Sequence, residues 1–175
     1  MHLLLILGCG LAALLLPLAA ASAADGEPPA SGATPWVIGS VGTFALVEQY
    51  NYPYLVGLQY RSTPRTSWAL MPGAGMAFGP DGIGYFYADV AHDFALPRRW
   101  TMTLSVAAGL FLNGDGIGAN EHLEFQSEIA FARQLVNGAR VGLAGFHISN
   151  GGLEHPNNGT EGLVLFLAVP VKPRR

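Results

Sequence analysis

The chain has 175 residues, of which 50% are hydrophobic and only 12% are charged, and its formal net charge is -3. A length of this order predicts a single domain. So few charged residues, together with 23 glycines, indicate a surface that lies partly out of water. No basic cluster is larger than the Arg98-Arg99 pair or the C-terminal Lys-Pro-Arg-Arg, which argues against a nucleic-acid-binding function.

The N-terminus has the features of a secretory signal. A long apolar run ends in Ala-Ser-Ala at positions 21–23, which predicts a signal peptide over residues 1–23. No Lys or Arg precedes the run, and it is long enough to span a bilayer, so an uncleaved anchor is the alternative. The single cysteine, Cys9, lies in this segment, which leaves the mature chain without a thiol. Residues 24–34 are expected to form a flexible lead-in and residues 35–175 the folded domain.

After residue 34, apolar and polar side chains alternate with a period of two, which predicts strands rather than helices. An even number of strands is what a closed antiparallel barrel of the outer-membrane type requires. We therefore predict an all-β fold, an eight-stranded antiparallel transmembrane β-barrel. The expected strands, separated by turn residues, are 35–45, 52–62, 66–78, 82–95, 99–112, 119–134, 138–150 and 160–171.

The direction of the apolar faces distinguishes a membrane barrel from a soluble sandwich. The alternation itself fits both, since a sandwich would turn the same apolar face inward. The secretory signal, the low charge and segments longer than the ~10 residues of a tilted membrane strand favour apolar faces directed toward lipid. In the fifth and sixth segments the outward set is Trp100, Met102, Leu104, Val106, Ala108 and Leu110, then Leu123, Phe125, Ile129 and Phe131.

The polar faces of the strands are then expected inside, where an eight-stranded barrel has room only for side chains. Buried polar groups need partners there. The expected interior carboxylates are Asp89, Asp93, Glu124 and Glu128, with Arg61, Tyr85, Tyr87 and Gln126 as candidate partners. Aromatic residues near strand ends are typical of girdles at the membrane interfaces, and those expected here are Trp36, Tyr52, Tyr54, Trp68 and Trp100.

Connection lengths predict the orientation of the barrel. Outer-membrane barrels have short periplasmic turns and longer external loops. The short connections at 62–65, 96–98 and 136–139 are therefore expected to face the periplasm, and Asn-Gly within the last is a strong hairpin signal. The longer connections, 113–119 and 151–160, should face outside. The chain ends in a basic segment rather than in the terminal aromatic residue common in such barrels.

Candidate catalytic side chains lie on the last two strands. His147 and Ser149 share one face of the seventh strand, and Glu161 lies on the apolar face of the eighth. Base, nucleophile and orienting acid could thus meet on the outer wall, a costly place for polar groups unless they satisfy one another. The Cα atoms of His147 and Ser149 should be ~7 Å apart from the strand rise, so a hydrogen bond needs the side chains to lean together or the strand to bulge.

At these residues the sequence resembles the lipid A 3-O-deacylases of the PagL type, small outer-membrane β-barrel esterases. The motif runs His147-x-Ser149-Asn150-Gly151, then Pro156-Asn157-x-Gly159-x-Glu161. The resemblance implies a triad with Ser149 as nucleophile, His147 as general base and acid, and Glu161 as the group that orients the imidazole. It also implies supporting roles for Asn150, as an oxyanion donor, and for Asn157, and a substrate contact for Phe125.

The resemblance further implies a serine esterase of the outer membrane that hydrolyses the 3-O-linked acyl chain of lipid A in lipopolysaccharide. Residues 35–175 would be its β-barrel deacylase domain. Lipid A carries this ester at the headgroup boundary of the outer leaflet, where an outward-facing site on the barrel rim would meet it directly. Such a triad needs no metal or other cofactor.

Other readings of these residues stay open. The chain could be a non-catalytic outer-membrane barrel with a structural or adhesive role. His147, His155, Glu154 and Glu161 could hold a metal ion, although no regular ligand spacing supports this. The sequence leaves undecided whether two copies associate as a homodimer through the apolar wall.

Overall fold

The computed structural model describes residues 34–46, 53–112, 123–153, 155 and 159–171. The predicted signal peptide and nearly all of the predicted lead-in lie outside these ranges, as do Tyr52 and Asn157. Within the described ranges, no helix has the length and hydropathy needed to cross a membrane.

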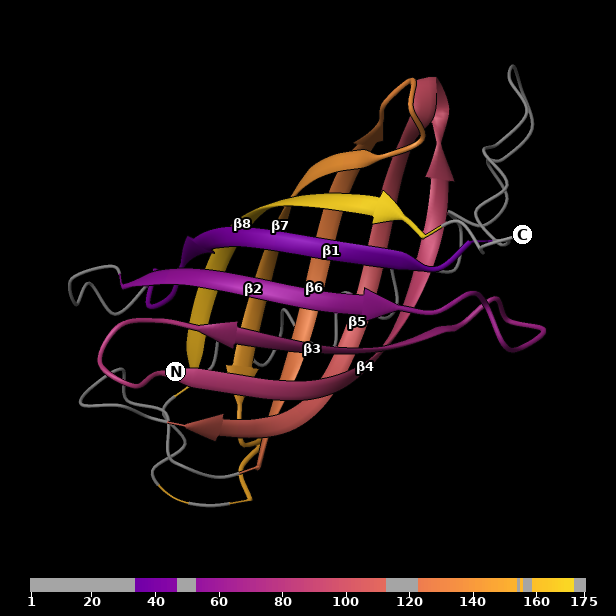
Figure 1. The fold of residues 1–175 in the computed structure, drawn as a ribbon. Coiled ribbons are helices and arrows are strands. Elements are labelled where there is room, and N and C mark those ends of the chain that lie inside the picture. Colours follow the sequence, from indigo (N-terminus) through magenta and orange to yellow (C-terminus); the bar gives the residue numbers. More distant parts are fainter. Residues whose placement is uncertain (1–33, 47–52, 113–122, 154, 156–158, 172–175) are drawn as a thin grey trace.

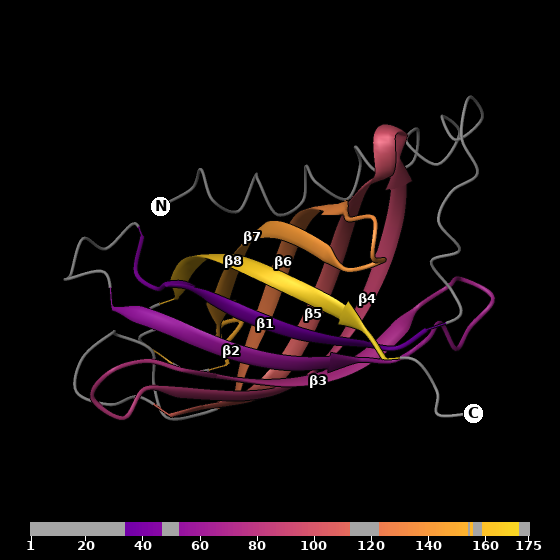
Figure 2. The same ribbon diagram turned by 45° about the horizontal axis from the view of Figure 1, so that its top comes forward.

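The described residues form a closed antiparallel β-barrel of eight strands in sequence order. β8 pairs with β1 along the whole of β1 and so closes the sheet, as two views of the ribbon show (Figures 1 and 2). The predicted fold is confirmed. The strands are β1 (Trp36–Thr43), β2 (Tyr54–Arg61), β3 (Met71–Phe78), β4 (Gly84–Leu96), β5 (Trp100–Leu112), β6 (Leu123–Gln134), β7 (Arg140–Ser149) and β8 (Thr160–Pro170), with a 3₁₀ turn, η2 (Pro97–Arg99), between β4 and β5.

The third strand begins later than the alternation predicts. β3 starts at Met71 rather than at residue 66, so residues 62–70 form a longer connection than the turn predicted at 62–65. The Leu70 N–H donates to Thr66 Oγ1 at 3.2 Å, and Ala69 has a left-handed φ of 54°. These local backbone features turn the chain before the strand starts, and side-chain alternation carries no information about them.

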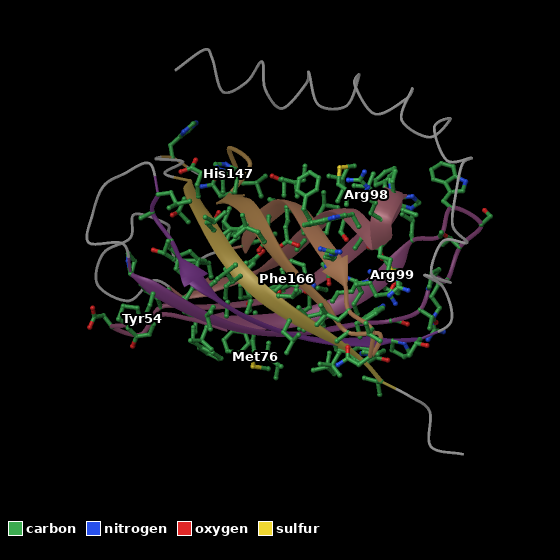
Figure 3. The ribbon with its side chains drawn as sticks, turned by 90° about the horizontal axis from the view of Figure 1, so that it is seen from above. Tyr54, Met76, Arg98, Arg99, His147 and Phe166 are labelled. Atoms are coloured by element: carbon green, nitrogen blue, oxygen red, sulfur yellow. The ribbon has the colours of Figure 1, made fainter. Side chains whose placement is uncertain are left out.

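The outer wall is apolar, as the alternation predicts. Val106, Leu110 and Leu165 are 63%, 61% and 59% exposed, whereas Thr101 and Thr103, on the opposite face of β5, are buried. Tyr54 and Met76 likewise project outward from the wall (Figure 3). The predicted facing of the fifth and sixth strands is therefore confirmed except at Met102, which the sequence placed on the exposed outer face and which is only 7% exposed.

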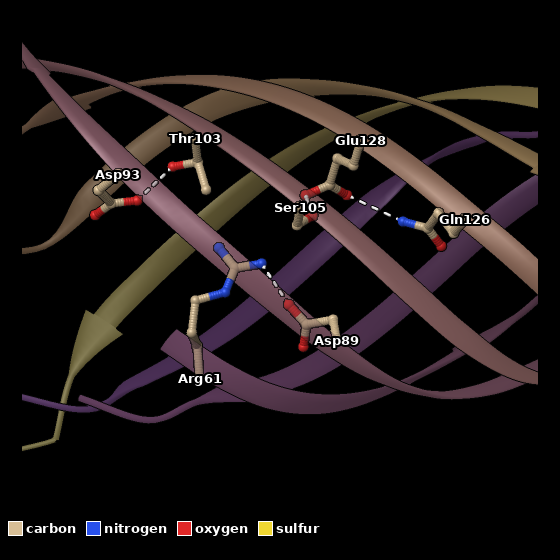
Figure 4. A network of polar contacts seen from close by, with 7 residues as sticks. All are labelled: Arg61, Asp89, Asp93, Thr103, Ser105, Gln126 and Glu128. Atoms are coloured by element: carbon tan, nitrogen blue, oxygen red, sulfur yellow. Dashed lines mark hydrogen bonds and ion pairs between the residues drawn. The ribbon is translucent and has the colours of Figure 1, made fainter. Parts of the chain in front are cut away.

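Ion pairs and hydrogen bonds join polar side chains in the interior of the barrel. Arg61 Nη2 lies 3.0 Å from Asp89 Oδ2, and Gln126 Nε2 donates to Glu128 Oε2 at 3.3 Å (Figure 4). Both contacts join residues that the sequence assigned to the interior. Asp93 is paired with Arg140, at 2.6 Å between Oδ2 and Nη1, a partner that the sequence analysis did not anticipate.

One residue assigned to the aromatic girdle faces the wrong way. Trp36 is only 8% exposed, and the guanidinium carbon of Arg140 lies 4.4 Å from its ring centroid, inside the barrel. Tyr54, Trp68 and Trp100, by contrast, are 62%, 76% and 40% exposed. Stacking on an interior cation stabilises the ring of Trp36 there, and a position near a strand end does not reveal the face on which a side chain lies.

Aromatic rings fill the interior below the β7–β8 loop. Phe44 packs edge-on against Phe111 and Phe146, with ring centroids 6.2 and 5.8 Å apart. Elsewhere in the described interior, a cavity of about 60 Å³ lies beside Arg61 and Arg140, too small for a fatty-acyl chain. The described interior is thus packed, and a site for a fatty-acyl chain, which the sequence predicts, would have to lie on the outside of the barrel.

Candidate active site

The side chains of His147 and Glu161 meet on the outer wall. β7 and β8 place the two residues directly opposite each other. His147 Nδ1 lies 3.0 Å from Glu161 Oε1, with the side chains 42% and 26% exposed. An ionised carboxylate only accepts hydrogen bonds, so in this pair Nδ1 donates, and Nε2 of the neutral ring is left to accept a proton.

The start of β8 is fixed by the loop that follows β1. Thr160 is fully buried, and its Oγ1 accepts a hydrogen bond from the Ala45 N–H at 3.2 Å. The Glu161 carbonyl accepts one from the Leu46 N–H at 3.3 Å. Phe44, just before these donors, is anchored in the interior at 1% exposure. The position of Glu161 is therefore set by contacts with both β7 and the β1–β2 loop.

Gly159 lies directly against the imidazole ring. A Cβ atom at this position would be 2.7 Å from His147 Cε1 and 3.1 Å from Nε2. It would also be 3.0 Å from the Ile148 carbonyl oxygen. Only a residue without a side chain lets the backbone approach the ring so closely. Gly159 thus forms one wall of the space into which the Nε2 edge of His147 points.

Two serines flank His147 on the outer face. Ser149 follows it on β7, and Ser127 stands opposite it on β6. The Nε2 edge of His147 points at Gly159. Because Ile148 pairs with Thr160, the next residues outward, Ser149 and Gly159, stand at the same level of the barrel. The imidazole therefore turns toward the row of Ser149 rather than that of Ser127. In the described part of the chain, no hydrogen bond joins Ser149 to His147.

An apolar hollow of about 580 Å³ opens on the outer wall beside these serines. It crosses β4, β5, β6 and β7, and His147 and Ser149 lie at one side of it. Hydrocarbon and methyl groups make most of its surface, which suits an acyl chain rather than a polar ligand. Its other outward-facing residues are Ala88, Val90, Val106, Ala108, Phe125 and Ser127.

Asn150 shapes the turn after β7. It is 2% exposed, and its Oδ1 accepts a hydrogen bond from the Gly152 N–H at 2.8 Å. Gly151, at φ +65°, brings the backbone against Phe125, whose Cδ2 atom would be 3.5 Å from an added Cβ. The side chain of Asn150 therefore supports the loop beside Ser149, and its role as an oxyanion donor stays a prediction. Asn157 lies outside the described residues.

A family model described as "Lipid A 3-O-deacylase (PagL)" matches residues 49–170. The chain belongs to this deacylase family. A curated relative agrees with this assignment: a lipid A deacylase PagL of Pseudomonas aeruginosa is 28% identical over 175 residues, covering 90% of this chain and 98% of its own length. The protein is accordingly an outer-membrane β-barrel enzyme of the lipid A 3-O-deacylase family.

Solved structures show the same fold. The crystal structure of the outer membrane enzyme PagL matches with a TM-score of 0.61 and 22% identity, over 78% of this chain and 99% of that one. A de novo designed transmembrane β-barrel matches with a TM-score of 0.51 and 13% identity, over 85% of this chain and all of the design. At these identities the two matches show a shared fold and nothing more.

The structure brings together most of the residues that the sequence singled out. His147 contacts Glu161, and Ser149 and Phe125 line the same hollow. Sequence analysis missed Ser127, although it is a polar residue between the apolar outward residues Phe125 and Ile129 of β6. For the metal alternative, Glu154 lies outside the described residues, and the described ones contain no group of three or more His, Cys, Asp and Glu side chains arranged to hold an ion.

Proposed function

We propose that this deacylase hydrolyses the 3-O-linked acyl ester of lipid A with a triad of Ser149, His147 and Glu161 on the outer barrel wall. The observation that carries the proposal is the 3.0 Å contact between His147 and Glu161 on a lipid-facing surface, next to a serine and an apolar hollow. Polar groups are costly on an outer wall of aliphatic side chains, so a His-Glu pair at this place indicates a functional rather than a structural role.

In the proposed reaction, Ser149 Oγ attacks the ester carbonyl carbon while His147 Nε2 takes its proton. Glu161 holds the imidazole by Nδ1 and stabilises the imidazolium. The bond from carbonyl carbon to sugar oxygen then breaks as His147 returns the proton to that oxygen. Water, deprotonated by His147, hydrolyses the acyl-serine and restores the Ser149 hydroxyl. The His147–Ser149 hydrogen bond would form as substrate binds, since catalytic hydrogen bonds are often long without substrate.

The place of the site supports lipid A as the substrate. His147 and Ser149 lie at the end of β7 near the long β7–β8 connection, on the face of the barrel that contacts lipid. An ester near the headgroups of the outer leaflet would reach Ser149 without leaving the membrane. Its acyl chain would occupy the hollow that Val106 and Phe125 line.

Mass spectra of lipid A test the proposal. Lipopolysaccharide incubated with the purified barrel should lose one 3-hydroxyacyl chain, and Ser149→Ala should lower the rate about 10⁴-fold or more, as removal of a triad nucleophile does. Ser127→Ala is the matched control, because it removes an equivalent hydroxyl from the other side of His147, and it should retain activity. Loss of activity in Ser127→Ala alone would make Ser127 the nucleophile.

The alternative that the sequence left open, a non-catalytic structural or adhesive barrel, disagrees with the family to which the chain belongs, and it makes the opposite prediction. A folded native barrel, judged by heat-modifiable migration, would then leave the lipid A spectrum unchanged. The contact between His147 and Glu161 favours the esterase, since neither adhesion nor a purely structural role requires an oriented imidazole on the lipid face.

A further inference from the structure

Three arginines gather at the end of the barrel opposite the candidate active site. Arg98 and Arg99 form the β4–β5 turn, and Figure 3 shows both at the far end of the barrel from His147. Arg133, near the end of β6, is paired in register with Trp100 on the outer face. All three arginine side chains are exposed. We call this surface the basic rim.

The backbone at Arg98 and Arg99 is unusual for arginine. Both residues adopt left-handed φ angles, 60° and 64°. A turn of this kind favours Asn and Gly, because a Cβ atom makes this region costly. The β6–β7 turn at the same end follows that preference, with Gly138 at φ +86° after Asn137. The basic rim therefore carries two arginines at turn positions whose backbone conformation favours Asn and Gly.

No carboxylate in the described part of the chain pairs with these three arginines. Asp93, on the strand that leads into the turn, is held inside the barrel by Arg140. Arg98, Arg99 and Arg133 instead line an open hollow of about 520 Å³ on the outer surface. Its remaining lining is Gln134, Leu135 and Val136, and Val136 is 97% exposed.

We propose that the basic rim binds the phosphate headgroup of an anionic glycerophospholipid in the membrane leaflet opposite lipid A. Guanidinium groups bind phosphate oxygens through paired hydrogen bonds, and basic pockets at a membrane surface bind such headgroups. Trp100, 40% exposed beside Arg133, suits the interfacial region, and Leu135 and Val136 offer apolar contacts for the start of an acyl chain.

The position of the basic rim in the membrane indicates which class of lipid it meets. The chain enters β1 and leaves β8 at this end, and the β4–β5 and β6–β7 turns there are short, which is the periplasmic arrangement of outer-membrane barrels. The phosphates of lipid A lie in the other leaflet, beside the candidate active site. A soluble phosphate ion would make no apolar contact with the exposed side chains of Val136 and Trp100, whereas a lipid would. The proposal is independent of ester hydrolysis at Ser149.

Fluorescence of Trp100 tests the proposal in reconstituted bilayers. Trp68, in the connection before β3, is replaced by Phe, and Trp36 is enclosed in the barrel, so Trp100 reports on neighbouring lipid. Brominated phosphatidylglycerol should quench Trp100 more than brominated phosphatidylcholine at equal mole fraction, with an apparent binding preference of roughly 5- to 10-fold. Arg98→Asn/Arg99→Asn/Arg133→Gln should reduce this preference to about 1, because Asn keeps the turn conformation without the charge.

Two controls make the outcome decisive. Arg65→Gln removes a guanidinium from the β2–β3 connection at the same end, where Arg65 contacts Ser62, and it should leave the preference unchanged. Inorganic phosphate should relieve quenching no more than sodium chloride of equal ionic strength. Equal quenching by the two lipids in the native barrel, a preserved preference in the folded triple variant, an equal loss in Arg65→Gln, or displacement by phosphate would each overturn the proposal.

Discussion

Gly159 determines where the imidazole of His147 can point, because it has no side chain. Its backbone lies so near His147 that an added methyl group would be 2.7 Å from Cε1. The barrel fixes β7 and β8 on either side, so the ring rather than the strands must move. A glycine in a loop motif can thus act as a positioning residue for a histidine that it does not hydrogen-bond.

Gly159→Ala should therefore lower kcat roughly 10- to 100-fold while the barrel stays folded, since small misplacement of a catalytic group has effects of this order. The proposed triad predicts a larger change in kcat than in KM, because Nε2 is displaced while the acyl hollow is untouched. Gly145→Ala is the control, as its added Cβ would meet only the Gly162 carbonyl oxygen at 4.0 Å. Steady-state rates on purified lipopolysaccharide distinguish the two, and equal rates for both variants would exclude a positioning role.

At the scale of single residues, the motif predicted which side chains form the candidate site, and strand periodicity predicted the face of the barrel on which they lie. The pairing of His147 with Glu161 across β7 and β8 was implied by the resemblance, and the structure gives it a distance. The burial of Asn150 could not be foreseen, because it depends on a turn that the alternation does not describe. Ser127 was overlooked because only its partner strand reveals that it stands opposite His147.

At the scale of the element, alternation was sufficient wherever a strand has one polar face. β5 and β6 were predicted within a few residues, and their inward and outward sets are confirmed except for Met102, which is buried. β1 was harder, since Val37 and Ile38 are both apolar and adjacent, so the pattern does not assign a face to Trp36. The later start of β3 has a different origin: the turn at residues 66–69 is formed by hydrogen bonds of the backbone, which side-chain alternation does not describe.

The hollow on the outer wall exists because β4 and β5 carry short side chains opposite the larger ones of β6. Ala88 pairs with Ala108, and Ala108 with Phe125, so a shallow surface borders an aromatic ring. Val106 stands in register with Ser127, which in turn faces His147. A bulky residue at position 106 would fill the space next to the candidate nucleophile.

Val106→Trp should therefore lower kcat/KM for lipid A by roughly tenfold, since exclusion of part of an acyl chain changes binding by one to three kcal/mol. Val56→Trp on β2 is the matched control. It places the same ring on the lipid face, at a residue 51% exposed, but several strands away from the hollow. Deacylation rates on one lipopolysaccharide preparation compare them, and an unaffected Val106→Trp enzyme would place the acyl chain elsewhere.

At the scale of the whole molecule, the two ends of the barrel carry two different proposed sites. One end has its interior filled with aromatic rings and carries His147 and Ser149 on its outer wall, and the other carries the basic rim. The interior between them is occupied by ion pairs rather than by a channel. The proposed reaction on the outer wall therefore requires one orientation of the barrel in the membrane, since lipid A lies in one leaflet only.

Single cysteines measure that orientation, because the only cysteine of the sequence, Cys9, lies in the predicted signal peptide. Leu153, 66% exposed in the loop after Ser149, and Val136, 97% exposed in the β6–β7 turn, lie at opposite ends. A bulky maleimide that does not cross the outer membrane should label Leu153→Cys in intact cells, and Val136→Cys only after permeabilisation. The native chain should stay unlabelled in both conditions, whereas labelling of it would mean that the segment containing Cys9 is retained. Labelling of Val136→Cys in intact cells would place the proposed active site in the periplasmic leaflet, away from lipid A, and would contradict the proposed substrate.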